Sequence, residues 1–247
     1  FAGYGGIGIE ATIEGRNVIL NDLNPSANFI SDCILEKNID LKKLEKMYYE
    51  IMNKCKEINE KWYTYKGKEI ITILRNKENK ILKIKIKNSN NKFEDITISK
   101  EESENLISNE NKYKIKTWYP NNTLIQNSRI CSNGKLKISD LFSKRSLICH
   151  SYLYTLLSNL EDSNEKKLLI LAFTSNLANC SKLVPPIKSR GDMAQGAWMT
   201  GFYIGETYLE NNVFHYYENR IKKIIKGKKD YLSLAKKNTT YKITCND

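Results

Sequence analysis

The residues best suited to chemistry lie near the start of the chain, in the runs FAGYGGIG at residues 1–8 and NDLNP at residues 21–25. Glycines let a backbone adopt positive φ and approach a ligand closely. Asp22 follows Gly3 by 19 residues. In nucleotide-binding folds this spacing puts an acid at the end of the next strand, where it accepts hydrogen bonds from ribose hydroxyls. The two runs therefore predict a site for a ribose-containing ligand.

The surrounding sequence predicts the elements that position this site. Gly3–Gly8 forms a turn that leads into a short helix over Ile9–Glu14. Gly15 follows the helix, where a left-handed cap is needed. The apolar run Asn17–Leu20 ends at Asp22 and is typical of a buried parallel strand. A strand–turn–helix arrangement of this kind belongs to an α/β fold.

Three interpretations compete for the glycine run. The spacing Gly3-x-Gly5-x-x-Gly8 matches the dinucleotide fingerprint of nicotinamide enzymes, although that fingerprint often matches by chance. An unrelated structural turn is a second alternative. The third is a resemblance to the S-adenosylmethionine site of amino-directed nucleic-acid methyltransferases, and it rests on Phe1-x-Gly3-x-Gly5 together with the NDLNP run. We favour this third interpretation.

The resemblance implies S-adenosyl-L-methionine as the cofactor. In the amino-directed methyltransferases, the aromatic residue and the glycines flank the methionine part and the acid holds the ribose. Carried over to this chain, Phe1, Gly3 and Gly5 contact the methionine end and Asp22 holds the ribose. The run Tyr241–Asp247 resembles the strand that leads to the adenine-contacting acid, so Asp247 is also expected to bind the cofactor.

Later segments extend the resemblance to a prokaryotic family of adenine-specific DNA methyltransferases. These segments are LFSKR at 141–145, LILAFTS at 169–175, GAW at 196–198, GFY at 201–203 and NVFHYYENR at 212–220. In that family a long insert separates the cofactor half from the catalytic half. The implied fold is an incomplete Rossmann-like methyltransferase core with an inserted α+β region.

The same resemblance implies four parts of the chain and a reaction. Residues 1–62 are expected to bind the cofactor, 63–138 to form a β-rich insert, 139–237 a helical region for DNA recognition, and 238–247 to return to the core. The expected reaction is methyl transfer to adenine N6 or, second, cytosine N4, within a restriction-modification or related system. DNA is then the substrate, and a restriction endonuclease is an expected partner. An RNA methyltransferase and a non-catalytic DNA-recognition module are the alternatives.

One departure from the family concerns the catalytic motif. Such enzymes carry Asp, Asn or Ser, then Pro-Pro, then an aromatic residue, which hold the target amine and stack on the flipped base. The Pro185-Pro186 pair lies instead between Val184 and Ile187. We interpret it as a loop and assign no catalytic residue. Both chain ends are expected to be cut within the fold, with an ordinary frayed terminus as the alternative.

Charge also favours a polyanionic partner. The formal net charge is +12, and binding to DNA releases counterions. A biased base usage in the source genome explains the same composition. Lys144, Arg145, Arg190 and Arg220 fall in or beside the family-like segments and are expected near DNA. Alternatively, Arg145 or Arg220 holds a structural salt bridge.

The rest of the chain is predicted from its periodicity. Asp40 caps a long helix whose apolar stripe runs from Leu41 to Trp62. Alternation predicts strands over residues 82–87 and 112–117, with Asn-rich turns at 88–91 and 105–111. Helices are expected over 141–160, from a cap at Ser163 to about 180, and over 213–235 with an interruption at Gly227.

Several functional classes are disfavoured. The sequence has no apolar run of about 18 residues, so no membrane span is expected. The six cysteines are scattered, which argues against a zinc ribbon and leaves a reducing cytoplasm as the expected location. His150 and His215 lie in apolar helical contexts and are expected to be packed or hydrogen-bonded, and no metal site is predicted.

Overall fold

The computed structural model describes residues 2–88, 90–127 and 134–245, and the chain divides into two compact units. Unit 1 comprises residues 1–50, 160–174 and 219–247, and unit 2 comprises residues 51–159 and 175–218. The fold is mixed α/β, which confirms the sequence prediction at that level. Phe1 and Asp247, two of the expected cofactor residues, lie outside the described residues.

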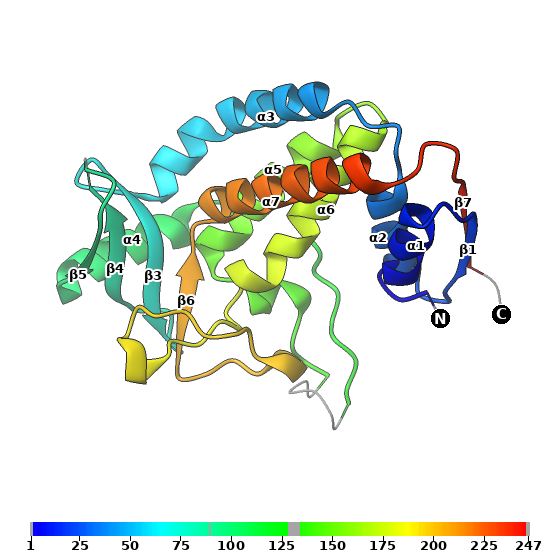
Figure 1. The fold of residues 1–247 in the computed structure, drawn as a ribbon. Helices are drawn as coiled ribbons and strands as arrows, with labels where there is room; N and C mark the ends of the chain where they lie inside the picture. Colours follow the sequence, from blue (N-terminus) through cyan, green and yellow to red (C-terminus); the bar gives the residue numbers. More distant parts are fainter. Residues whose placement is uncertain (1, 89, 128–133, 246–247) are drawn as a thin grey trace. The chain divides into compact units, whose positions relative to one another are not determined.

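Unit 1 contains a small parallel sheet, β1 and β7, that Figure 1 shows side by side. In their register Val18 lies opposite Tyr241 and Asn21 opposite Thr244. The elements that lie wholly within unit 1 are α1 (Gly6–Ile13), β1 (Val18–Asn21), α2 (Pro25–Leu35) and β7 (Tyr241–Thr244). Three further helices contribute residues to both units: α3 (Leu41–Trp62), α6 (Asn164–Leu177) and α7 (Val213–Leu234).

The core of unit 1 lies on one face of this sheet. Leu20 of β1 packs with Leu35 of α2 and with Tyr231 of α7, and Ile9 of α1 joins them. Ile19 points the other way and is 73% exposed. The prediction of a parallel strand ending before Asp22 is therefore confirmed. The expectation of a buried strand holds for one face only, because Leu20 is buried in the core while Ile19 is exposed on the other face.

Two local signals in unit 1, at Gly15 and Asp40, act as the sequence predicted, whereas the helix α2 and its cap Asn24 were not predicted. Gly15 adopts φ +82° just after α1, in the left-handed region. Asn24 caps α2 by accepting a hydrogen bond from the Ser26 amide, and Pro25 opens the helix. Asp40 caps α3 by accepting from the amides of Lys42 and Lys43. These caps satisfy backbone donors that a helix start leaves unpaired.

The main sheet of unit 2 is antiparallel, with β3 at its centre. Its strands are β2 (Thr64–Tyr65), β3 (Lys68–Asn76), β4 (Ile81–Lys87), β5 (Phe93–Thr97) and β6 (Thr207–Asn211). β3 pairs with β2, β4 and β6, and β4 pairs with β5. Ile84 and Ile86 are buried while Lys83, Lys85 and Lys87 are half-buried, which confirms the predicted strand and its alternation over residues 83–87. Leu82, expected on the buried face, is exposed.

Two predictions in the middle of the chain are wrong. The Asn-rich run 105–111, expected to be a turn, belongs to α4 (Lys100–Lys112). Ser99 accepts from the Glu102 amide and Glu102 accepts in return from the Ser99 amide, and this capping box starts the helix. Residues 113–117, expected to be a strand, follow α4 without regular structure, and Thr117 Oγ1 donates to Ser151 Oγ at 2.7 Å.

The strand β6 was not predicted from the sequence. It lies just before the helix α7 and pairs with β3 from Thr72–Asn211 to Asn76–Thr207. The division into 1–62, 63–138, 139–237 and 238–247 remains a prediction about function. In the structure, the sheet of the predicted insert includes β6, which comes from the third range.

The later helices agree with their predicted ranges. α5 (Lys144–Ser158) begins after its cap Ser143, and a short 3-10 turn, η1 (Ile138–Leu141), precedes it. Ser163 caps α6 by accepting from the Lys166 amide. α7 continues through Gly227 without the predicted interruption. None of the helices in the described part of the chain has the length and apolar character needed to span a bilayer.

Candidate functional site

The glycine turn is fastened to the end of β1 by backbone hydrogen bonds. The Ala2 amide donates to Asn21 O at 3.0 Å, and the Gly5 amide donates to Ala2 O at 3.1 Å. The Gly3 amide donates to Asp22 Oδ2 at 2.9 Å. The structure thus brings together Gly3, Gly5 and Asp22, as the sequence predicted.

Gly5 and Gly8 are explained by close packing. Gly5 adopts φ +80°, and a Cβ there would lie 3.0 Å from Ser31 Oγ and 3.3 Å from Ser31 Cα. A Cβ at Gly8 would lie 2.8 Å from Leu35 Cδ1 and 3.0 Å from Leu20 Cδ1. These glycines allow α1 to pack tightly against its neighbours.

Gly3 has a different environment. It adopts φ +54°, and a Cβ at this position would meet no atom within 4 Å. A steric clash therefore does not account for this glycine. The open space beside its backbone is where a ligand can approach the turn.

Asp22 is a carboxylate held by the backbone. Its Oδ1 accepts from the Asn24 amide at 2.9 Å and its Oδ2 accepts from the Gly3 amide at 2.9 Å. The hydrogen bonds from Asn24 and then Gly3 lower the pKa of Asp22 below its usual value. Asp22 O also accepts from Asn28 Nδ2 at 2.8 Å. The side chain is therefore ionised and fixed, and each oxygen keeps a lone pair for a further donor.

The strand β7 reaches the same end of β1 as Asp22. The Asp22 amide donates to Thr244 O at 3.2 Å, and Thr244 Oγ1 donates to Asn21 Oδ1 at 3.0 Å. The carboxyl ends of two parallel strands thus meet at the glycine turn. In open α/β sheets ligands bind beyond such strand ends.

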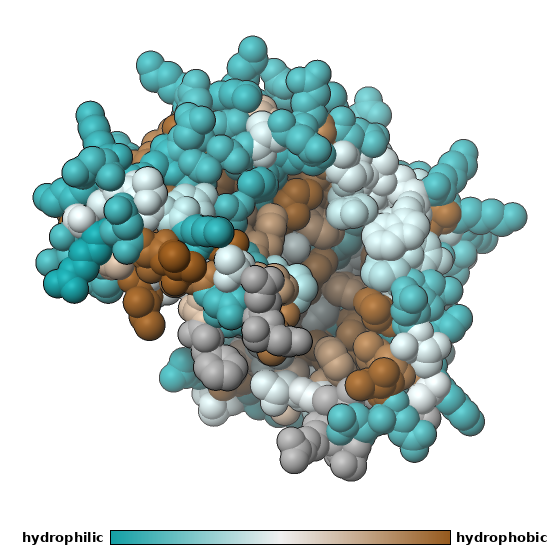
Figure 2. All heavy atoms as spheres, turned by 90° about the vertical axis from the view of Figure 1, so that its right-hand side faces the viewer, coloured by the Kyte–Doolittle hydropathy of each residue, from teal (hydrophilic) through white to brown (hydrophobic). Residues whose placement is uncertain are grey.

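The surface around the turn has exposed apolar side chains. Tyr4, Ile7, Ile19 and Leu23 are each more than half exposed. Figure 2 faces the side of the molecule where Figure 1 places β1 and β7, and it shows apolar (brown) patches among polar (teal) side chains. Unit 1 also has an apolar cavity of about 440 Å³ over α1, α2, α6 and α7, but Gly3, Gly5 and Asp22 do not line it.

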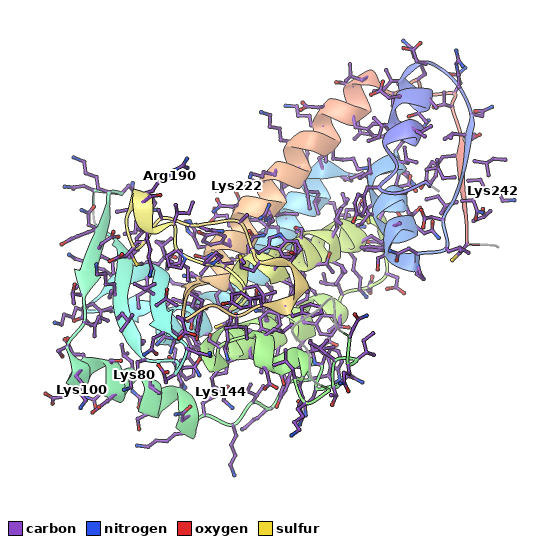
Figure 3. All side chains as sticks on the ribbon, turned by 90° about the horizontal axis from the view of Figure 1, so that it is seen from below. Lys80, Lys100, Lys144, Arg190, Lys222 and Lys242 are labelled. Carbon is purple, nitrogen blue, oxygen red and sulfur yellow. The ribbon has the colours of Figure 1, made fainter. Side chains whose placement is uncertain are left out.

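The four expected DNA-binding residues have different environments. Arg190 is exposed in a 3-10 turn, η3 (Lys188–Arg190), whereas Lys144 and Arg220 are half-buried on α5 and α7. Figure 3 shows Lys144 and Arg190 on opposite sides of unit 2 in this view. Arg145 is only 1% exposed. Its expected contact with DNA does not fit this position, and the alternative, a structural salt bridge, describes it.

Arg145 belongs to a buried group of four charges that sequence reasoning missed. Arg75 Nη2 and Arg145 Nη2 each lie 2.7 Å from Glu110 Oε1. Arg75 Nε lies 2.7 Å from Glu210 Oε2, and Arg145 Nε lies 3.7 Å from Glu210 Oε1. All four side chains are almost fully buried. Two positive and two negative charges balance, as a buried ionic group requires.

Burial and pairing oppose each other in this charge group. Burial disfavours ionised Glu110, but the charges of Arg75 and Arg145 outweigh it and hold the pKa of Glu110 below its usual value. Arg75 and Glu110 also line a cavity of about 330 Å³ together with Lys144 and Lys182. Burial lowers the pKa of Lys182. An arginine at the end of the mostly apolar run IITILR, residues 70–75, was the signal that the sequence offered.

His150 and the proline pair are both packed into unit 2. Burial lowers the pKa of His150 to about 4, and His150 Nδ1 lies 3.0 Å from Ser146 O. The Pro185 carbonyl accepts from the Gly196 amide, and the Val184 carbonyl accepts from the Leu209 amide. Both of these carbonyls are thus engaged in the fold, which agrees with the interpretation of the pair as a loop.

Comparison with protein-family models, with curated proteins and with solved structures finds no match to this chain.

Proposed function

We propose that unit 1 is the S-adenosylmethionine-binding part of a DNA methyltransferase that acts on the amino group of a base, adenine N6 first and cytosine N4 second. One observation carries the proposal. The Gly3 amide and the Asp22 carboxylate are joined at the carboxyl end of β1, beside open space at Gly3. The Rossmann-like core expected from the sequence is part of this proposal, and the parallel pair β1–β7 supports it.

The residues present fit the cofactor. The ionised Asp22 has lone pairs free for two ribose hydroxyls. The helix α1 begins at Gly6 without a side-chain cap, so its first amides and its dipole can hold the methionine carboxylate near Gly3. When bound, S-adenosylmethionine supplies an electrophilic methyl group.

Charge supports DNA as the substrate. The formal net charge is +12, and Arg190 is exposed while Lys144 and Arg220 are half-buried. These cations suit phosphates better than they suit a neutral substrate. No residue is proposed to hold the target amine, because the described Pro185 carbonyl is already hydrogen-bonded to Gly196.

Cofactor binding is the direct test of this proposal. We would titrate the protein with S-adenosylmethionine, S-adenosylhomocysteine and NAD by isothermal calorimetry. We expect the first two to bind and NAD not to bind. Asp22→Ala should weaken S-adenosylmethionine binding on the order of tenfold to a hundredfold, because charge-assisted hydrogen bonds to two hydroxyls are removed.

The matched control is Asp230→Ala, which removes an exposed aspartate on α7 of the same unit. This variant should bind S-adenosylmethionine as the wild type does. Unchanged affinity in a folded Asp22→Ala variant would remove Asp22 from the site. Binding of NAD in place of S-adenosylmethionine would favour the dinucleotide interpretation instead.

A second test concerns methyl transfer. The sequence contains no run of a polar residue, Pro-Pro and an aromatic residue. We therefore expect these 247 residues to bind the cofactor without transferring its methyl group to unmethylated genomic DNA. Labelled cofactor measures this, with RNA as a parallel substrate. Transfer to DNA would show that the catalytic residues are present here in another arrangement, and transfer to RNA alone would favour the RNA alternative.

A further inference from the structure

A long loop of unit 2, residues 185–206, is anchored along its length although it has little regular structure. The Gly196 amide donates to Pro185 O at 2.9 Å, and the Ile187 amide donates to Ala194 O at 2.8 Å. A Cβ at Gly196 would lie 2.9 Å from Pro185 O, so only glycine allows this close approach. These hydrogen bonds fix much of the backbone of the loop.

Side chains fasten the middle of the loop to the main sheet. Met193 is buried with Leu74 of β3, Leu209 of β6 and Val184. Lys85 Nζ of β4 donates to Met193 O at 3.0 Å. Because the loop is fixed to three strands or their flanks, the side chains that it leaves outside have defined positions.

Two of the side chains outside are aromatic. Trp198 is 47% exposed and Tyr203 is 48% exposed. They flank a short 3-10 turn, η4 (Thr200–Phe202), in which Gly201 and Phe202 both have positive φ. An exposed indole on an anchored loop is apolar surface open to a partner.

The acidic and the basic residues of the loop differ in whether they form ion pairs. Its acids are engaged by lysines: Asp192 Oδ2 lies 2.6 Å from Lys83 Nζ, and Glu206 Oε1 lies 3.1 Å from Lys77 Nζ. Its cations, Lys188 and Arg190, are exposed, and in the described part of the chain no ion pair involves Arg190. Figure 3 shows the Arg190 side chain at the outer edge of unit 2. The loop therefore carries two exposed aromatic rings and exposed cations, of which Arg190 has no ion pair among the described residues.

We propose that this aromatic loop binds single-stranded or locally unstacked DNA, with Trp198 and Tyr203 stacking on bases and with Lys188 and Arg190 contacting phosphates. Stacking on rings beside a basic surface is how proteins hold single strands. Two other ligands fit the loop less well. Rigid duplex DNA has stacked bases, so it would contact only the cations. An apolar protein surface would contact only the aromatic rings. The choice of DNA as the ligand rests on the proposed function, but the binding of DNA to this loop requires no cofactor.

The test uses fluorescence anisotropy with a labelled thymidine 20-mer and with a duplex of the same length. Wild type should bind the single strand more tightly than the duplex. Trp198→Ala should weaken single-strand binding on the order of tenfold, whereas Trp198→Phe should stay within a few-fold of wild type because its ring still stacks. Trp118→Ala is the matched control, since Trp118 is also exposed in unit 2, and should change nothing.

The cations are tested by the salt dependence of the same binding. Replacing Lys188 and Arg190 by alanine should lower the slope of log affinity against log salt by about 0.7 for each phosphate that is no longer neutralised. Thermal unfolding confirms that each variant is folded. Equal affinity of wild type and Trp198→Ala, or equal losses for Trp198→Ala and Trp118→Ala, would overturn the proposal, as would tighter binding to the duplex.

The outcomes separate this inference from the proposed function. If S-adenosylmethionine binds and the loop variants leave single-strand affinity unchanged, the loop assignment fails while the cofactor site stands. If the loop variants lose single-strand binding and S-adenosylmethionine does not bind, the cofactor site fails and the protein is a DNA-binding module.

Discussion

Two carboxylates, one in each unit, reach a lowered pKa by opposite means. Asp22 of unit 1 is held by the amides of Asn24 and Gly3, and no burial is needed. Glu110 of unit 2 is almost fully buried, and the charges of Arg75 and Arg145 keep it ionised against the cost of burial. The first carboxylate keeps lone pairs facing solvent, whereas the second has two guanidinium groups on one oxygen.

The difference teaches how to distinguish a binding group from a structural one. A perturbed pKa by itself marks both. A charged side chain that the backbone orients and that stays accessible to solvent can bind a ligand. A charged side chain that is buried against opposite charges has a structural role in packing. On this criterion the glycine turn of unit 1 is the candidate binding site that we propose, and the buried charge group has a structural role in unit 2.

The largest expected effect comes from breaking the buried charge group. Arg75→Met leaves Glu110 and Glu210 short of one positive charge inside unit 2. We expect a loss of about 3–5 kcal/mol in the free energy of unfolding, measured by urea denaturation. Arg190→Met, the exposed control, should stay within about 0.5 kcal/mol of wild type. Similar small losses in both variants would contradict the structural role of the group.

The next effect is the pH dependence of stability that the buried imidazole of His150 in unit 2 should cause. Burial lowers the pKa of His150 from its usual 6.5 to about 4. Between these values the unfolded chain binds a proton that the folded chain does not. His150 therefore contributes stability that is present above pH 6.5 and is lost as the pH falls, by at most about 1.4 kcal/mol per pH unit.

Urea denaturation from pH 7 to pH 4 measures this dependence. Relative to wild type, His150→Gln should show a flatter decline of stability with falling pH, because its side chain does not titrate. His215→Gln, which changes the half-buried second histidine, should keep most of the wild-type decline. A parallel decline in wild type and His150→Gln would show that other groups control acid stability.

A third effect separates two glycines of the turn. Gly5→Val places a branched side chain against Ser31 at φ +80°, so we expect it to destabilise folding by about 2–3 kcal/mol. Gly3→Ala meets no atom and should cost about 1 kcal/mol at its positive φ. Its methyl group should nevertheless weaken S-adenosylmethionine binding. Normal cofactor affinity in Gly3→Ala would place the ligand elsewhere.

The smallest effect concerns the cation at the start of α5. Lys144→Ala should weaken duplex binding a few-fold and lower the salt slope by about 0.9, the value for one neutralised phosphate. Lys100→Ala is the control, since Lys100 is exposed at the start of α4 and lies apart from Lys144 in Figure 3. Equal slopes for wild type and Lys144→Ala would remove Lys144 from the DNA surface.

The parts of the site that the sequence predicted are local. Gly3, Gly5 and Asp22 lie within one turn–helix–strand unit, where spacing alone fixes their proximity. The cap Asp40 acts within three residues of its position. Such features depend on neighbouring residues only, and a single sequence contains all of them.

The parts that were missed depend on distant partners. Arg75, Glu110, Arg145 and Glu210 come from β3, α4, α5 and β6, and no local pattern indicates which charges pair. β6 becomes a strand by pairing with β3, which lies far away in the sequence. The error over residues 105–111 was avoidable, because Ser99-x-x-Glu102 is a helix-start signal that the sequence itself contains.

The pairing of β1 with β7 has a consequence for the order of folding. The Thr240 amide must find Asn17 across 223 residues, whereas β3 and β4 meet through a tight turn between Asn76 and Ile81. The longer closure costs roughly 3 kcal/mol more in chain entropy. We expect the hairpins of unit 2 to form early and the pairing of β7 with β1 beside the glycine turn to form late.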